Sequence, residues 1–255
     1  MPLSKEEARA ELAWRKLFFD LSDKEKTNKT TLALTDAAWN GNLEIVKLYL
    51  AAGVDINARN TECGNTPLYA AAENGQWDVA QFLLDNGAGP NIANNRGRTP
   101  LLSAVEQGID KKSESCDPRA KRLIQSLLDK NANINAKDSK TGATPLFAAI
   151  EGGDADVIKV FLSKGANVNA KNDDGDTLLF RAVSKQNQEV IKLLLDQGSD
   201  INAKDVNGET VLMKAVQQND IELVRLLLSR GAGIKVKTIK TKISFHNREV
   251  KRQNF

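Results

Sequence analysis

The chain has 255 residues, of which 41% are hydrophobic and 27% are charged, enough for one or two domains with a substantial core. No uninterrupted apolar run exceeds five residues, which excludes a membrane span of about 20 residues. The N-terminus carries Glu6 and Glu7 where a signal peptide carries only basic residues. We therefore expect an intracellular protein of the cytoplasm or the nucleus.

The counts of cysteine and histidine exclude several kinds of site. Cys63 and Cys116 are the two cysteines, and His246 is the single histidine. Disulfide frameworks, cysteine-rich zinc sites, multi-histidine metal sites and most catalytic triads need more of these residues. The sequence also lacks a phosphate-binding loop, a nucleophile elbow and a dinucleotide-binding fingerprint. We expect no enzyme activity, no metal and no cofactor.

Residues 1–31 predict an N-terminal capping helix followed by a polar linker. Ser4 and Glu7 form a capping box at the start of residues 4–20. Apolar residues then recur at helical spacing: Trp14, Leu17, Phe18 and Leu21. We expect this helix to cover the exposed end of the structure that follows, and docking on a partner is the alternative. Residues 22–31 are polar and predict a linker.

From residue 32 the sequence is a repeat of about 33 residues. The copies are 32–65, 66–98, 99–143, 144–176, 177–209 and 210–242, the last of which keeps the pattern only to about Gly231. The third copy contains about 11 extra residues, around 109–119. A period of this length predicts a stack in which each copy buries its apolar face against the next.

Each copy predicts two short helices and an extended turn. Thr66, Thr99 and Thr144 can cap the first helix, and a proline follows each of them at the first helical position. Gly75 and Gly153 are expected to end it. The second helix carries an apolar stripe, and a glycine suited to a left-handed conformation follows it. These glycines are Gly53, Gly87, Gly165, Gly198 and Gly231. The chain then turns at a tip rich in asparagine, aspartate and glycine.

The 109–119 insertion is expected to be a solvated loop, and a functional loop is the alternative. Cys116 lies in it beside acidic residues, which argues against a stabilised thiolate.

The unit resembles the ankyrin repeat. Thr-Pro-Leu, which opens the repeat in that family, occurs at 66–68, 99–101 and 144–146. The histidine that follows it in the family is replaced by Tyr69, Leu102, Phe147, Phe180 and Met213, so we expect apolar packing at this position. The resemblance implies an all-α repeat solenoid of helix-turn-helix plus β-hairpin units. It also implies a non-catalytic protein–protein interaction module acting as an adaptor, a scaffold or an effector.

The resemblance implies a partner-binding concave groove formed by hairpin tips and the exposed positions of each first helix. The partner-binding residues on this register are Trp39, Asn40, Glu73, Asn74, Arg96, Arg98, Glu106, Gln107, Lys140, Glu151, Asp173, Asp174, Asp176, Ser184, Lys185, Asn207, Gln217 and Gln218. The tips also include Arg59, Asn95 and Glu209. Arg96 and Arg98 are basic, whereas Asp173, Asp174 and Asp176 are acidic, so a partner of mixed charge is expected.

Trp39 is the strongest single candidate for an anchor, because exposed tryptophans commonly dominate interface energetics. Its alternative is burial under the N-terminal helix.

Four asparagines occupy a position that is hydroxylated in several ankyrin-repeat proteins: Asn57, Asn135, Asn169 and Asn202. The expected role of each is a hydrogen bond that holds the hairpin.

The C-terminal end is basic. The whole chain carries a net charge of +3, but residues 235–255 alone carry +6. Apolar residues alternate imperfectly with lysines there, which predicts a short hairpin or a disordered basic arm ending in the tail 243–255. We expect a solvated tail or a cover of the last repeat. The alternative function is a regulator tethered through this tail to nucleic acid or an anionic membrane surface. The expected partners are one or more proteins, and the chain is expected to be a monomer.

Overall fold

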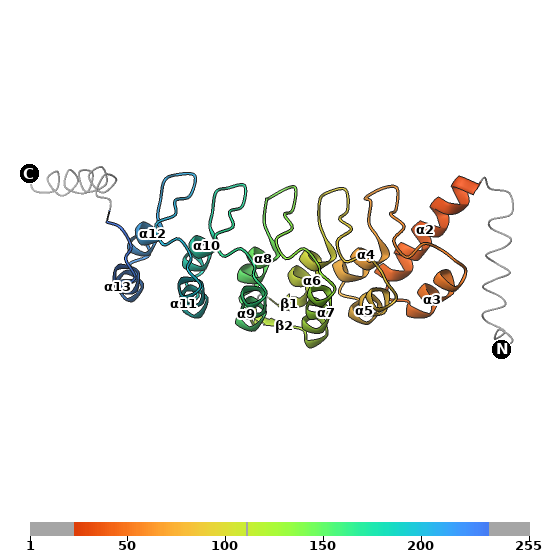
Figure 1. The fold of residues 1–255 in the computed structure, drawn as a ribbon, viewed down its shortest axis with the longest axis horizontal. Helices are drawn as coiled ribbons and strands as arrows, with labels where there is room; N and C mark the ends of the chain where they lie inside the picture. Colours follow the sequence, from red (N-terminus) through yellow and green to blue (C-terminus); the bar gives the residue numbers. More distant parts are fainter. Residues whose placement is uncertain (1–22, 111, 235–255) are drawn as a thin grey trace, which may run out of the picture.

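The computed structural model describes residues 23–110 and 112–234, which form a row of helix pairs (Figure 1). In chain order the pairs are α2 (Asp23–Trp39) with α3 (Leu43–Ala51), α4 (Pro67–Glu73) with α5 (Trp77–Asp85), α6 (Pro100–Gly108) with α7 (Pro118–Asp129), α8 (Pro145–Gly152) with α9 (Ala155–Ser163), α10 (Leu178–Ser184) with α11 (Gln188–Asp196), and α12 (Val211–Gln217) with α13 (Ile221–Ser229). We call the first member of each pair the inner helix and the second the outer helix.

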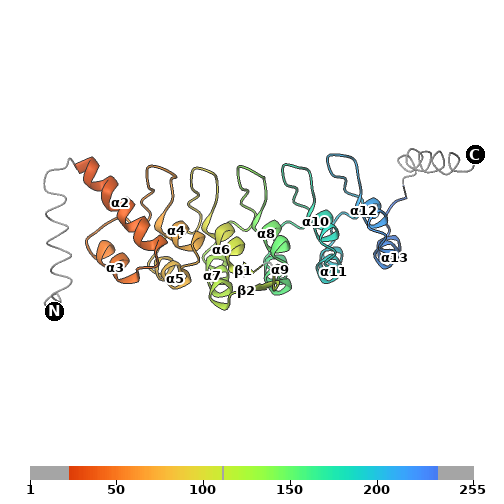
Figure 2. The same ribbon diagram turned by 180° about the vertical axis from the view of Figure 1, so that it is seen from behind.

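Loops between successive pairs, here called finger loops, project from one edge of the row. They span residues 52–66, 86–99, 130–144, 164–177 and 197–210. The inner helices lie between these loops and the outer helices in both views (Figures 1 and 2). This arrangement confirms the predicted all-α repeat stack.

Local capping signals place the helix starts. The hydroxyl oxygens of Thr66, Thr99, Thr177 and Thr210 each accept a hydrogen bond from the backbone N–H three residues later, at 3.1–3.4 Å. Thr144 occupies the same position, but its side chain makes no such bond. Pro145 directly after it already presets the helical backbone, so α8 begins there without the cap.

The helix ends follow the predicted left-handed positions. All five glycines predicted after the outer helices have φ between 79° and 91°. Gly75 and Gly153 also have positive φ after α4 and α8. In the last two pairs the equivalent residues are Gln186 and Asn219, each at φ 58°. A glutamine there is strained because its Cβ crowds the backbone, whereas asparagine tolerates this region better.

One continuous core runs through the row between neighbouring pairs. A leucine two residues after each of four capping threonines is at most 1% exposed: Leu68, Leu101, Leu146 and Leu179. The residues that replace the family's histidine are buried at Tyr69, Leu102, Phe147 and Phe180, and Met213 is half-buried. Apolar packing at this position is therefore confirmed for Leu102, Phe147 and Phe180, whereas the Tyr69 hydroxyl accepts a hydrogen bond from Arg98.

The linker predicted over residues 22–31 is wrong from Asp23 onward, because α2 begins there and continues into the first repeat. Thr30 and Thr31 are buried, and the Thr31 carbonyl accepts a hydrogen bond from the Thr35 hydroxyl at 2.8 Å. Tertiary burial of these threonines thus outweighs the polar character of the segment. The helix predicted at residues 4–20 and the tail 235–255 lie outside the described residues.

A two-stranded hairpin interrupts the third pair. β1 (Ile109–Asp110) and β2 (Ser115–Cys116) are antiparallel, with Ile109 opposite Cys116 and Asp110 opposite Ser115. None of the helices in the described ranges is both long enough and apolar enough to span a membrane.

Candidate protein-binding face

The predicted site residues lie at the C-terminal ends of the inner helices and on the finger loops, which together we call the inner face. Eleven of the eighteen side chains are exposed: Trp39, Asn40, Asn74, Arg96, Gln107, Lys140, Asp173, Asp174, Lys185, Asn207 and Gln217. The other seven are half-buried: Glu73, Arg98, Glu106, Glu151, Asp176, Ser184 and Gln218.

Trp39 is the last residue of α2 and is 40% exposed. Its backbone carbonyl accepts a hydrogen bond from Asn74 Nδ2 at 2.8 Å. Its indole therefore sits at one end of the inner face on a backbone held by the neighbouring pair. The alternative, burial under the N-terminal helix, falls on residues outside the described part of the chain.

Some predicted binding residues also link consecutive inner helices. Asn74 binds the Trp39 carbonyl, and Lys185 Nζ donates to the Glu151 carbonyl at 2.9 Å. Gln218 Nε2 makes the equivalent contact with the Ser184 carbonyl at 3.4 Å. Because the last carbonyls of a helix have no partner inside it, these side chains satisfy them and hold the helices in register.

Arg98 is engaged within the stack. Its guanidinium forms an ion pair with Glu106 and lies 3.5 Å from Glu73 and 3.9 Å from Asp138, while Nε donates to the Tyr69 hydroxyl at 3.3 Å. Burial alone would lower the pKa of Arg98, but the hydrogen bond and charge of Glu106, with smaller contributions from Tyr69 and Glu73, raise it. The side chain is only 18% exposed, so Arg98 joins the second and third finger loops more than it offers charge to solvent.

Backbone hydrogen bonds tie neighbouring finger loops together. Asn95 N donates to the Cys63 carbonyl at 2.9 Å, and Ser139 N donates to the Arg96 carbonyl at 3.2 Å. Asp173 N donates to the Thr141 carbonyl at 2.9 Å. The tips are therefore braced, while the side chains of Arg96 and Lys140 remain exposed beside them.

The fourth and fifth finger loops are acidic. Asp173 and Asp174 are exposed, and Asp176 lies 3.8 Å from Arg181. Burial is the largest cause that raises the pKa of Asp176, and Asp205 and Asp174 raise it further against the opposing charge of Arg181. Asp205 was not among the predicted residues, although it holds its own loop by accepting from Asn207 N and Glu209 N at 2.9 and 2.8 Å.

Three more predicted residues form local pairs. Glu151 lies 2.7 Å from Arg181 Nε and 3.1 Å from Lys185 Nζ. Gln217 Nε2 donates to Glu209 at 2.8 Å, and the Ser184 hydroxyl donates to the Phe180 carbonyl at 2.9 Å.

The four asparagines considered for hydroxylation each bind the next repeat. Asn57, Asn135, Asn169 and Asn202 accept from the backbone N–H of Gly89, Asn167, Asp200 and Gly233, respectively, at 2.7–2.9 Å. Asn91 does the same for Asn133 N at 2.6 Å. The Asn-Ala pattern did not indicate Asn91, because isoleucine follows it in place of alanine.

The expectation of a solvated 109–119 loop is wrong for Ile109 and Cys116. Ile109 and Cys116 are 5% and 6% exposed, and Cys116 N donates to Asp154 Oδ2 at 2.7 Å. Gly152 admits the isoleucine, since a Cβ there would lie 2.6 Å from Ile109 Cγ2. The insertion thus docks on the fourth pair, because Ile109 of β1 packs against α8 and Cys116, paired with Ile109, donates its backbone N–H to Asp154.

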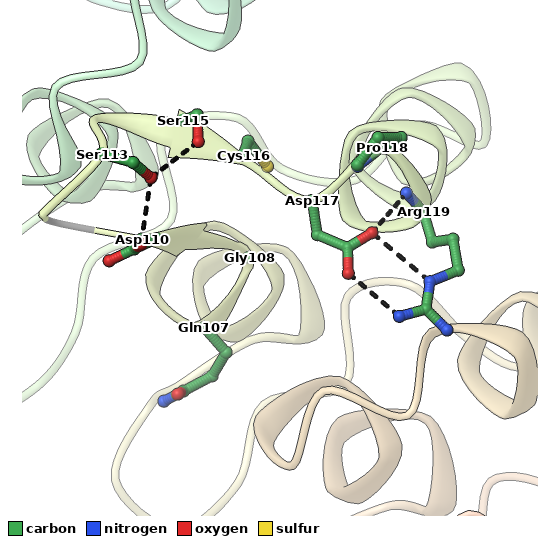
Figure 3. A pocket seen from close by; sticks show the side chains of 9 residues that line it. All are labelled: Gln107, Gly108, Asp110, Ser113, Ser115, Cys116, Asp117, Pro118 and Arg119. Carbon is green, nitrogen blue, oxygen red and sulfur yellow. Dashed lines mark hydrogen bonds and ion pairs between the residues drawn. The ribbon is translucent and has the colours of Figure 1, made fainter.

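A pocket of about 660 Å³ opens beside this hairpin (Figure 3). It is lined by Gln107, Gly108, Asp110, Ser113, Ser115, Cys116, Asp117, Pro118 and Arg119. Its polar groups bind one another: Ser113 Oγ lies 2.9 Å from Asp110 and 2.8 Å from Ser115 Oγ, and Asp117 pairs with Arg119 at 3.1 Å.

The cysteine beside this pocket is not an activated nucleophile. Burial, with the charge of Asp154 added, raises the pKa of Cys116 to about 12. The prediction that this thiolate is not stabilised is therefore confirmed. Nor do the described residues contain a cluster of three or more metal-ligating side chains.

The fold defines a helical repeat stack whose helix pairs are joined by braced finger loops. A family model described as ankyrin repeats (3 copies) matches residues 34–117, 114–205 and 172–238, so the chain belongs to the ankyrin repeat family. Ankyrin repeats are generally protein–protein interaction modules, and the repeat region is typically non-catalytic.

Curated relatives and a solved structure agree with this assignment. An ankyrin repeat protein of Fowlpox virus (strain NVSL) is 32% identical over 149 residues, which cover 56% of this chain and 40% of that protein. One from Rickettsia felis is 34% identical over 134 residues, covering 52% and 40%. The crystal structure of an ankyrin repeat domain from Acinetobacter baumannii matches with a TM-score of 0.68 and 29% identity, covering 79% of this chain and 98% of that one. The match thus spans less than half the length of the two curated relatives.

Proposed function

We propose that this chain binds a partner protein through the inner face, using the exposed tips of the finger loops and the ends of the inner helices. The single observation that carries the proposal is a contrast between two sets of positions in the repeat. Scaffold positions hold the same kind of residue in successive copies, such as the buried leucines of the inner helices. The position at the end of the inner helix instead holds, in chain order, Trp39, Glu73, Glu106, Glu151, Ser184 and Gln217.

The charges on the tips indicate what the partner presents. Exposed Arg96 and Lys140 lie on the second and third finger loops, and exposed Asp173 and Asp174 lie on the fourth. Arg98 contributes little to this pattern, because it is paired with carboxylates within the stack. A partner with an acidic group toward the second and third loops and a basic group toward the fourth complements this order.

The experiment compares how well three full-length proteins capture a partner protein: the natural chain, a face variant and a control variant. The face variant carries Trp39→Ala, Arg96→Ala and Asp174→Ala. The control variant carries Leu48→Ala, Lys192→Ala and Glu222→Ala, which remove one apolar, one basic and one acidic side chain from exposed positions on outer helices. We expect the control to retain the partner and the face variant to bind it at least about tenfold more weakly, with unchanged helical circular dichroism.

Equal loss in both variants, or full retention by the face variant, contradicts the proposal. Recovery of nucleic acid or anionic lipid in place of a protein, by both variants alike, supports the tethered regulator instead. Titration at two salt concentrations separates these outcomes, because binding to a polyanion weakens steeply with salt.

A further inference from the structure

The C-terminal end of the stack is an apolar surface without a cover among the described residues. Figure 1 shows α12 and α13 at one end of the row, with no described element beyond them. The sixth residue after the capping threonine is buried in four preceding repeats: Ala72, Val105, Ile150 and Val183 are at most 2% exposed. Val216 occupies the same position in the last repeat and is 58% exposed.

The outer helix of the last pair extends this surface. Ile221 and Leu228 of α13 are 61% and 41% exposed. Gln188, which precedes Ile221 by one 33-residue period, donates to Asp220 of the following pair at 3.0 Å. The position of Ile221 therefore faces the side on which a following repeat would stack, and it holds an apolar residue there.

The backbone at the end of the described chain keeps the hydrogen bond that precedes inner helices in earlier repeats. Gly233 N donates to Asn202 Oδ1 at 2.7 Å, which is the bond that Gly89, Asn167 and Asp200 make with the asparagines of the preceding repeats. After those earlier bonds the chain passes through a finger loop and into the inner helix that covers the previous pair.

The sequence that follows Gly233 is suited to such a cover but is not a further repeat of the same kind. It lacks the capping threonine with proline and the asparagine–glycine tip, yet it alternates lysines with Val236, Ile239, Ile243 and Phe245. Phe245 lies 33 residues after Leu212, at the position that a buried leucine holds in the preceding repeats.

We propose that residues 235–255 of the same chain cover the end of the stack, with their apolar side chains against Val216, Ile221 and Leu228 and their basic side chains toward solvent. Tethering favours this occupant over a second copy, because a linked segment has an effective concentration of about millimolar. The inference is independent of where a partner binds on the inner face.

The test is a double-mutant cycle in the full-length chain. The first change is Val216→Ser. The second is a tail variant carrying Ile239→Ser, Ile243→Ser and Phe245→Ser, and its matched control carries Lys235→Ser, Lys237→Ser and Lys240→Ser. Urea unfolding reports the coupling between the changes, and hydrogen exchange reports the protection of α12 and α13.

We expect the tail variant to speed amide exchange in α12 and α13 by about tenfold or more, and the lysine control to leave it unchanged. Val216→Ser should lower the urea midpoint in the natural background and have no further effect in the tail variant. Equal effects of Val216→Ser in both backgrounds overturn the proposal. So does a dimer in sedimentation velocity that Val216→Ser dissociates, because a second copy is then the cover.

Discussion

Truncating Ile109 tests whether the inserted hairpin connects the third and fourth repeats. The side chain is 95% buried and lies against α8 at Gly152. Ile109→Ala removes three carbon atoms, which corresponds to about 2.4 kcal/mol of lost burial at about 0.8 kcal/mol per methylene. With a residual cavity, we expect a loss of about 2–4 kcal/mol in the free energy of unfolding.

Tryptophan fluorescence shows which part of the stack loses stability. Trp14, Trp39 and Trp77 all lie in the N-terminal third of the chain, so fluorescence reports the first repeats while circular dichroism reports the whole stack. Because repeat stacks unfold through neighbour interactions, weakening one interface should separate the two urea transitions. Ser113→Ala, at the exposed tip of the same hairpin, serves as the control and should keep them coincident.

If Ile109→Ala changes the urea midpoint by no more than Ser113→Ala does, the Ile109 side chain does not stabilise the stack. If stability falls while the fluorescence and circular dichroism transitions stay superimposed, the hairpin does not connect the third and fourth repeats.

Three further predictions concern strain, pH and thiol reactivity. Gln186→Gly should raise the free energy of unfolding by about 0.5–1 kcal/mol by relieving a positive φ, and Asn219→Gly should raise it less, as urea midpoints would show. Asp176→Asn should raise the melting temperature at pH 7 but not at about pH 3. The folded-state pKa of Asp176 is raised, so ionisation disfavours the fold above that pKa, and below the unfolded value the carboxyl is protonated in both states. An alkylating reagent at pH 7.5 should label exposed Cys63 and spare Cys116 in the folded chain, and label both in urea, as counted by mass spectrometry.

The residues of the inner face show which features of the site could be predicted from the sequence. The exposed positions of Trp39, Arg96, Lys140 and Asp174 follow from the phase of the repeat, which the local sequence of each copy defines. Arg98 was predicted as a binding residue from the same phase, but its charge is engaged by Glu106, Glu73 and Asp138. Glu73 lies in the same repeat as Arg98, whereas Glu106 and Asp138 belong to the next repeat, and Asp138 is 40 positions away along the chain. No pattern within one unit indicates such a cluster.

The amino-acid sequence was enough to predict the class of fold, the phase of the repeats and the residues that begin and end most helices. It could do so because capping threonines, prolines and left-handed glycines act on the backbone within a few residues. Three features are visible only in the tertiary structure: α2 continues through the expected linker, Ile109 and Cys116 dock on the fourth pair, and Val216 has no cover among residues 23–110 and 112–234. Each of these depends on what lies beside a residue in the neighbouring repeat, and burial is a property of both neighbours together.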